Sequence, residues 1–461
     1  MNIVIIGAGD IGQHLATIFS KMNYGIVLVD KNSKKLEQIS RDLDVATRFG
    51  SGTDWELLEE LMEFSPNLLI ALTNDDETNL VACTIAKNLG YPQTIARVRS
   101  NKFFNQGRLS FERLFCVDYL IGPEKLTADA LANMILVPHS IYVEDFAHGS
   151  IQMRTFKIPE KWKKGGLLLS EREKFGLPSQ LMVGLIRRSY FNETKGKAVF
   201  KGEEILFPHG QDSLLPGDEV TFIGESEAVQ SLHKFFGFQN KVPKSVMIVG
   251  GSLIGQNLAQ ILQDHLIRVR ILDKDFDKCA MLSEKLTLST VIHRDGLDYP
   301  FLRSEKVEDV DVFVACTRND EVNFLAATSA RELGCENVLI SLSDTNLIPL
   351  IHRLGISQAA SPRIHAANRI LSIAREQTIA SMVSMYNNQA EIMEVKVSAN
   401  SKIVGIPIRQ LGPELPNDFL IVMIQSRGRI FIADGSRILS PGDTVVVISS
   451  PRHVNEIKKL F

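Results

Sequence analysis

Short β-rich apolar runs alternate with helix-like stretches along the first 136 residues of the chain. This alternation is typical of a doubly wound parallel sheet, in which each strand is followed by a crossover helix. Helices are expected between the strands, for example at Gly12–Met22 and Glu77–Leu89. The expected strands are Ile3–Ile6, Ile26–Val29, Val45–Phe49, Leu68–Leu72, Thr94–Val98 and Tyr119–Ile121.

The same order of patterns returns in the second half of the chain. The run from Ile70 to Glu77 parallels the run from Val314 to Glu321. Further pairs keep the same register, namely Asn79 with Asn323, Gly90 with Gly334, and Gly122-Pro123 with Ser361-Pro362. Because the match extends over six strands, the chain is predicted to contain an internal repeat.

A second pair of similar segments follows the two sheets. Leu215–Val220 resembles Ser440–Val445, and each contains a Pro-Gly-Asp turn that leads into a β-rich run and a short closing helix. These segments predict small α+β modules, and the polar stretch 239–244 is the expected boundary between the halves. The predicted order is A–B–A′–B′, with domains at residues 1–136, 137–238, 244–378 and 379–461.

Each predicted parallel sheet begins with a glycine-rich turn. The first is Gly7-Ala8-Gly9-Asp10-Ile11-Gly12 and the second is Gly250-Gly251-Ser252-Leu253-Ile254-Gly255. Such turns let backbone amides approach a pyrophosphate at the N-terminus of the next helix. In both copies an acid, Asp30 or Asp273, follows the last glycine by 18 residues. Strand, turn and spaced acid, all occurring twice, predict two Rossmann-like nucleotide-binding domains.

The acids bear on the choice of nucleotide. A carboxylate at the end of the second strand accepts hydrogen bonds from ribose hydroxyls and repels a 2′-phosphate, which favours NAD or adenine nucleotides over NADP. Lys31 and Lys274 follow the acids directly and weaken the argument against NADP. The alternative is that both acids are simply solvated residues at strand ends.

The two copies differ at positions that matter for anion binding. The second has Ser252 where the first has Gly9, so a Cβ is expected close to the pyrophosphate. It also has Ser341 where the first has Arg97, whose guanidinium can bind phosphate or ribose. The first site is therefore expected to bind anions better, although Arg97 could instead be a surface ion-pair residue.

Composition narrows the function classes. The 461 residues are 44% apolar and 23% charged, and the net charge of −3 gives no basic field for nucleic acid. Five scattered cysteines fit a reducing cytosol, and no apolar run approaches a membrane span. The cluster Lys161–Lys164 is expected to be a solvated loop. No tyrosine is followed four positions later by lysine, and no histidine pair has metal-binding spacing, so no catalytic or metal site is expected.

The chain resembles the TrkA family, the cytosolic regulatory subunits of bacterial Trk potassium uptake systems. The likeness rests on Asn2–Gly12, Asp30, Gly50–Thr53, Thr73–Asn79 and Ala96–Ser100, and on the Leu-x-Pro-Gly-Asp-x-Val runs at Leu214–Val220 and Leu439–Val445. The resemblance implies two RCK N-terminal (KTN) domains, each followed by a small RCK C-terminal domain.

The resemblance also implies which residues contact NAD(H) or an adenine nucleotide. In the first copy these are Gly7 to Ile11, Asp30, Thr73, Asn74 and Arg97; in the second they are Gly250 to Ile254, Asp273, Thr317 and Arg318. The family's third-strand Gly-Asp pair appears as Gly50-Ser51 and as Arg294-Asp295, so each copy keeps half of it.

The repeated glycine turns without a catalytic set predict a non-enzymatic nucleotide sensor with NAD(H) as its ligand, or ATP or ADP in its place, and the resemblance implies that it regulates potassium uptake. By resemblance, its partner is a TrkH-like potassium-translocating membrane subunit, and the chain forms a tetrameric homo-oligomeric ring. It is expected in the cytoplasm, peripheral on the cytosolic face of the inner membrane. Two alternatives remain at this point: an NAD-dependent oxidoreductase, and a regulator of potassium efflux.

Overall fold

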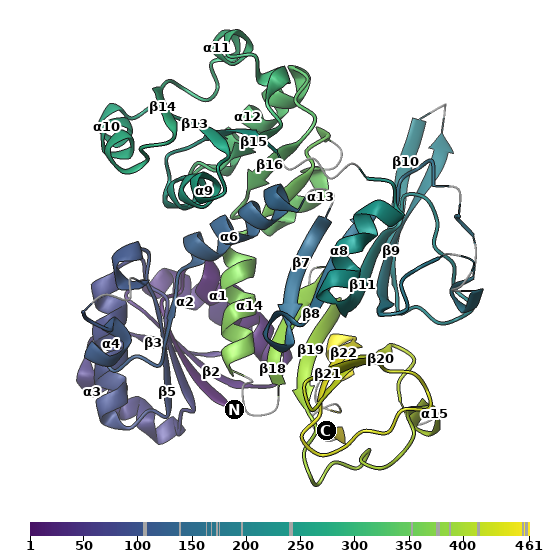
Figure 1. Cartoon of the computed structure of the whole chain (residues 1–461). Coiled ribbons are helices and arrows are strands. Elements are labelled where there is room, and N and C mark those ends of the chain that lie inside the picture. Colours follow the sequence, from purple (N-terminus) through teal and green to yellow (C-terminus); the bar gives the residue numbers. More distant parts are fainter. Residues whose placement is uncertain are drawn as a thin grey trace. The chain divides into compact units, whose positions relative to one another are not determined.

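A computed structural model of the chain shows four β-sheets connected in sequence order (Figure 1). It describes residues 1–104, 108–137, 140–162, 164–166, 168–171, 174, 176–194, 197–238, 243–351, 354–374, 379–386, 389–412, 415–453, 456 and 460–461. Residues 239–242 of the predicted boundary and Lys163 of the predicted basic loop lie outside this part of the chain.

The first sheet has six parallel strands in the order β3-β2-β1-β4-β5-β6. Because strand order reverses between β1 and β4, a crevice opens at the carboxyl ends of these two strands. The strands are β1 (Asn2–Ile6), β2 (Gly25–Asp30), β3 (Ala46–Phe49), β4 (Leu68–Ala71), β5 (Gln93–Arg97) and β6 (Tyr119–Ile121). All six strands predicted from the apolar runs are present within one or two residues of their expected ends.

Helices connect these strands and cover the sheet (Figure 1). They are α1 (Asp10–Lys21), α2 (Ser33–Asp42), α3 (Trp55–Glu60), α4 (Asp76–Leu89), α5 (Phe111–Leu114) and α6 (Pro123–Leu136), with 3₁₀ turns at Leu61–Phe64 and Asn101–Phe104. Every residue of β4 is buried, as expected for a strand covered on both faces. Polar side chains cap the N-termini of several helices. For example, the Asp75 carboxylate accepts a hydrogen bond from the Thr78 amide in the first turn of α4.

The second parallel sheet repeats this topology as β14-β13-β12-β15-β16-β17. Its strands are β12 (Ser245–Val249), β13 (Arg268–Asp273), β14 (Thr290–His293), β15 (Val312–Ala315), β16 (Val338–Ser341) and β17 (Gln358–Ala360). Its helices are α9 (Leu253–Asp264), α10 (Phe276–Lys285), α11 (Tyr299–Ser304), α12 (Asp320–Glu332), α13 (Ile348–Ile351) and α14 (Pro362–Ala374), with 3₁₀ turns at Val307–Asp309 and Thr345–Leu347. The internal repeat inferred from the sequence is therefore a repeat of structure.

The two parallel sheets belong to one compact unit, made of residues 1–132 and 243–370. Within it the repeats contact each other directly: the Asn101 amide in the first donates to the Asn257 side chain on α9 in the second. The crevices of the two sheets therefore lie in the same unit.

The remaining residues, 133–242 and 371–461, form a second compact unit with two antiparallel five-stranded sheets. One sheet has the order β10-β9-β11-β8-β7 and the other the order β18-β19-β22-β20-β21. The strands of the first are β7 (Ser140–Phe146), β8 (Ile151–Lys157), β9 (Leu181–Thr194), β10 (Lys197–Leu206) and β11 (Glu219–Glu225). Those of the second are β18 (Ile379–Met385), β19 (Ala390–Lys396), β20 (Phe419–Ser426), β21 (Arg429–Ile432) and β22 (Thr444–Ser449).

The two Pro-Gly-Asp turns lead into β11 and β22, as predicted. The expected closing helix after β11 is α8 (Ser226–Phe235), and after β22 the described residues contain a 3₁₀ turn at Pro451–His453. Other short helical segments of this unit are α15 (Ile408–Leu411) and 3₁₀ turns at Ala147–Gly149 and Leu169–Glu171. The predicted fold class, two parallel α/β sheets each followed by a small module, is confirmed.

One apolar cluster in this second unit draws on both five-stranded sheets. It contains Phe146, Ile151 and Leu185 from the first sheet and Ile392, Val422 and Ile448 from the second. All six side chains are buried. The two modules therefore share this core, in addition to a separate apolar cluster within each module.

Candidate functional site

The first glycine turn connects β1 to α1 and cannot contain larger residues at two of its positions. Gly7 has φ of +104°, and a Cβ there would lie 3.0 Å from the backbone nitrogen of Thr73. A Cβ on Gly12 would lie 2.0 Å from the Gly7 carbonyl oxygen. At Gly9, by contrast, a Cβ would meet nothing within 4 Å, so space is open in front of the turn. The turn is thus tight against the sheet and open toward the crevice.

Asp30, at the end of β2, lies against this turn. Its carboxylate accepts hydrogen bonds from the backbone nitrogens of Ala8 at 2.6 Å and Asn32 at 2.8 Å. Gly50 and Ser51 follow the neighbouring strand β3; the Gly50 amide bonds to the Asp30 carbonyl, and the Ser51 hydroxyl pairs with Thr53. The acid is therefore held at the turn by backbone amides.

A fully buried asparagine joins the ends of β4 and β5. The Asn79 side-chain oxygen accepts from the Thr73 amide at 2.9 Å and from its hydroxyl at 2.7 Å. Its side-chain nitrogen donates to the carbonyls of Thr73 at 3.0 Å and Arg97 at 2.9 Å. The sequence showed only that Asn79 repeats as Asn323, and its positioning role was not predicted.

Arg97, which ends β5, reaches over the crevice to a helix beyond the sheet. Its guanidinium donates to Asn74 at 3.2 Å and to Glu124, in the first turn of α6, at 3.1 Å. Arg99 donates to the same Glu124 oxygen at 3.1 Å. The Arg97 and Glu124 side chains are each only 13% exposed, so this is not the solvated surface pair considered as an alternative. Neither Arg99 nor Glu124 was predicted as a site residue, although Arg99 lies only two residues after Arg97.

One cavity of about 390 Å³ brings most of the first set of predicted residues together. Its walls come from both repeats, and it includes Gly7, Gly9, Asp10, Ile11, Asp30, Thr73, Asn74 and Arg97 together with Ser252, Leu253, Ile254, Thr317, Arg318 and Ser341. Ala8, Gly12, Gly50 and Ser51 are not among the residues that line this cavity. The first cleft is therefore shared between the repeats, which the sequence did not indicate.

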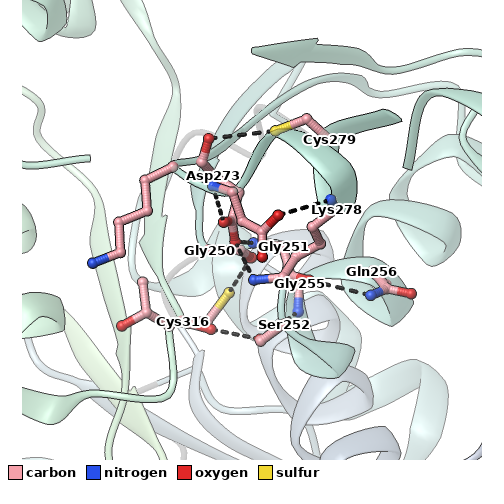
Figure 2. A network of polar contacts seen from close by, with 12 residues as sticks. Gly250, Gly251, Ser252, Gly255, Gln256, Asp273, Lys278, Cys279 and Cys316 are labelled. Atoms are coloured by element: carbon pink, nitrogen blue, oxygen red, sulfur yellow. Dashed lines mark hydrogen bonds and ion pairs between the residues drawn. The ribbon is translucent and has the colours of Figure 1, made fainter. Parts of the chain in front are cut away.

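The second glycine turn differs from the first through Ser252 (Figure 2). The Ser252 hydroxyl donates to the Cys316 carbonyl at 2.6 Å and accepts from the Gly255 amide at 3.3 Å. It caps α9, whereas Gly9 provides no side-chain cap for α1. The hydroxyl is turned into the protein, where helix capping satisfies it. That the Cβ of Ser252 lies close to a bound pyrophosphate stays a prediction.

Asp273, the acid at the second glycine turn, has more hydrogen-bond partners than Asp30 at the first. Asp273 accepts from the backbone nitrogens of Gly251 at 2.8 Å and Asp275 at 3.0 Å, and from the Lys278 ammonium group at 2.9 Å (Figure 2). Burial acts to raise the pKa of Asp273, but hydrogen bonds from Lys278 and these two amides hold the pKa below its usual value. The carboxylate is thus stabilised in its charged form.

A separate cavity of about 310 Å³ lies at this second turn. Six predicted residues line it, namely Gly250, Ser252, Asp273, Asp295, Thr317 and Arg318, and three of these, Ser252, Thr317 and Arg318, also line the first cavity. Gly251 and Gly255 are not among its lining residues. The buried Asn323 makes the same hydrogen bonds as Asn79. Its side-chain oxygen accepts from the Thr317 amide at 2.7 Å and from the Thr317 hydroxyl at 2.6 Å, and its side-chain nitrogen donates to the Ser341 carbonyl at 3.0 Å. Both repeats therefore build a cleft by the same means.

The described residues contain no group of three or more His, Cys, Asp or Glu side chains that could hold a metal ion. Within the same part of the chain, no helix is long and apolar enough to cross a membrane.

Comparison with known proteins identifies the family. The TrkA-N domain family matches residues 3–120 and 246–362, and the TrkA-C domain family matches residues 392–461. The chain belongs to the TrkA family. It is 30% identical to Trk system potassium uptake protein TrkA homolog 1 of Methanosarcina mazei over 100% of both chains. It is 28% identical to Trk system potassium uptake protein TrkA of Halomonas elongata, over 100% of this chain and 98% of that one.

A solved structure shares the fold. The GsuK channel bound to NAD superposes with a TM-score of 0.63 at 17% identity, covering 100% of this chain and 78% of the other. As a TrkA-family protein, the chain is a regulatory protein of potassium uptake and not an enzyme. The alternatives of an oxidoreductase and of a potassium efflux regulator are therefore set aside.

Proposed function

We propose that this TrkA-family chain is a peripheral subunit that binds nucleotides in its two clefts and thereby controls a TrkH-like potassium-translocating membrane protein. The observation that carries the proposal is the first cleft, where the open glycine turn, Asp30 and Arg97 border one cavity. Four copies would form a ring on the cytosolic face of the inner membrane, as the family resemblance implies. The division into domains at residues 1–136, 137–238, 244–378 and 379–461 is part of this proposal.

NAD(H) is the ligand we propose for the first cleft, with ATP or ADP as the alternative. The amides of Gly7 to Ile11 would receive the pyrophosphate at the N-terminus of α1, where anions are favoured. Asp30 would accept ribose hydroxyls, and Arg97 with Thr73 and Asn74 would contact the phosphates. The similar GsuK channel was solved with NAD bound, which agrees with this choice.

The shared walls of the cavity suggest how binding would reach the membrane partner. A nucleotide seated on the first glycine turn would also meet Arg318 and Ser252 of the second repeat. Its binding free energy would therefore depend on how the two repeats are arranged, and a coupling of about 1–3 kcal/mol is enough to change gating severalfold. No chemical step is required.

Calorimetry with NADH on the full chain tests the first cleft. Arg97→Ala and Asp30→Ala should each weaken binding by about tenfold or more, since each removes a charge-assisted contact. Asp273→Ala is the matched control, because it changes the equivalent acid of the second repeat, and we expect a smaller loss. Thermal unfolding should show that all three variants remain folded.

Equal losses in Asp30→Ala and Asp273→Ala would contradict the predicted inequality of the clefts. An unchanged dissociation constant in Arg97→Ala would show that Arg97 is only a structural partner of Glu124.

The membrane partner is tested separately: a tagged chain should retain a potassium-translocating protein from solubilised membranes. Recovery of no such protein would overturn that part of the proposal.

A further inference from the structure

The second cleft contains a cation where a ribose would be expected to approach. The Lys278 ammonium group lies 2.9 Å from a carboxylate oxygen of Asp273, and the two side chains are 34% and 10% exposed. Figure 2 shows this pair beside Gly251 of the glycine turn. The ribose-binding acid of this cleft is therefore already neutralised by the protein itself.

The position of Lys278 is unfavourable for the helix that carries it. Lys278 is the third residue of α10, in the first turn, where the helix dipole disfavours a positive charge. The Asp275 side chain already caps this turn by accepting from the Lys278 amide at 3.1 Å. Lys278 therefore does not help α10 begin, and its charge is directed at the cleft.

Other cations line the same cavity. Lys274 and Arg318 join Lys278 on its walls, against two carboxylates, Asp273 and Asp295. Arg318 stands where the first repeat has Asn74, so a positive charge is added at the end of the fourth strand. The volume of about 310 Å³ is at the lower limit for a ligand pocket and suits a mononucleotide portion.

The first repeat provides the comparison. Lys35 occupies the position on α2 that corresponds to Lys278, and it borders the first cavity. The ion pairs found in the described residues do not include one between Lys35 and Asp30, whose carboxylate is bonded to backbone amides alone. Both carboxylates are charged, but the charge of Asp273 is paired with the Lys278 ammonium group, so Asp30 should repel a 2′-phosphate more strongly than Asp273.

We infer that the second cleft takes a nucleotide with a phosphate on its ribose, of the 2′-phosphate class, and that Lys278 determines this preference. Lys278 cancels the charge of Asp273, and an ammonium group has three donors, of which Asp273 uses one. The remaining donors, with Lys274 beside them, would bind the additional phosphate. This inference rests on the proposed function, because it requires that the clefts bind nucleotides.

Calorimetry on the full chain with 2′,5′-ADP and 5′-AMP tests this inference, since the two probes differ in the 2′-phosphate alone. The wild type should bind 2′,5′-ADP more tightly. Lys278→Gln should reduce that preference about tenfold, which is the value of one charged contact. Lys278→Arg should keep it, and Lys35→Gln, the matched change in the first repeat, should leave it unaltered.

Each other outcome has a definite meaning. Equal affinity for the two probes in the wild type, or an equal effect of Lys35→Gln and Lys278→Gln, would overturn the inference while leaving nucleotide binding intact. Tighter binding of both probes by the Lys278→Gln variant would also overturn the inference, because it would show that the Lys278 side chain blocks nucleotide binding in the second cleft. Failure of the wild type to bind 5′-AMP, 2′,5′-ADP and NADH alike would instead overturn the proposed function.

Discussion

Asn79 and Asn323 illustrate how single buried residues shape both clefts. Each is fully buried, and each has both its side-chain oxygen and its side-chain nitrogen hydrogen-bonded to the ends of two neighbouring strands. A buried amide is stable only when its polar atoms are paired in this way. The asparagine thereby replaces the sheet hydrogen bonds that end where β4 and β5, or β15 and β16, separate.

Asn79→Ala should destabilise the protein by about 2–4 kcal/mol, because the Thr73 amide and two carbonyls would lose their buried partner. Urea denaturation measures the change in the free energy of unfolding. Asn88→Ala is the control in the same helix, since Asn88 is exposed and bonds to a helix carbonyl. If Asn79→Ala lowered the free energy of unfolding by less than about 0.5 kcal/mol, the ends of β4 and β5 would not depend on the hydrogen bonds of Asn79.

At the residue scale, the sequence predicted those site residues whose role follows from backbone spacing. Gly7, Gly12 and Asp30 were found because a turn, a helix and a strand of known length place them together. Glu124 and Lys278 were not found, because their contacts depend on side chains that reach across elements. Such contacts have no fixed spacing along the chain.

The starts of α1 and α9 show the same element built with different caps. Ser252 caps α9 with its hydroxyl, whereas α1 begins at Gly9 with no side-chain hydrogen bond. A side chain at Gly9 would be accommodated, as no atom lies within 4 Å of a Cβ placed there. The absence of a cap on α1 leaves its first amides available to an anion.

Exchanging the two caps should have opposite effects on stability. Ser252→Ala should lower the free energy of unfolding by about 1 kcal/mol, and Gly9→Ser should raise it by a few tenths of a kcal/mol, at about the limit of measurement, since glycine is itself a good N-cap residue. Both are measured by thermal unfolding without nucleotide. If Gly9→Ser were to destabilise the protein, the space in front of the turn would be smaller than the structure indicates.

At the element scale, prediction succeeded for the parallel sheets and was incomplete for the antiparallel ones. Buried strands such as β1 and β4 are continuous apolar runs, which are easily recognised between helices. In the small modules the sequence located β11 and β22 through their Pro-Gly-Asp turns. It did not predict the order in which five strands pair, because antiparallel pairing depends on contacts between distant segments.

At the scale of the whole molecule, the second unit joins the two halves of the chain. Its apolar cluster includes buried side chains from both five-stranded sheets. Burial of each such side chain stabilises the unit by about 1.5–3 kcal/mol, so the combined contribution is large. The chain between the halves is therefore not the only connection within this unit.

The halves should remain associated when the chain is divided. Residues 1–238 and 243–461, produced together as separate chains, should co-purify because they share this core. Val422→Asp, which places a charge among buried side chains, should separate them, whereas Arg429→Asp at an exposed position of the same sheet should not. Independent behaviour of the two unmodified halves would contradict a shared core.

The shared core has a consequence for how the two clefts can differ. If two identical half-length chains met through the same surfaces, every substitution would appear in both clefts, because such a pair is symmetric. Fusion into one polypeptide removes this constraint while the common core holds the halves together. Lys278 lines the second cavity and not the first, so a substitution there would change one cleft and leave the other untouched. On the proposed function, a single molecule would then respond to two metabolic signals.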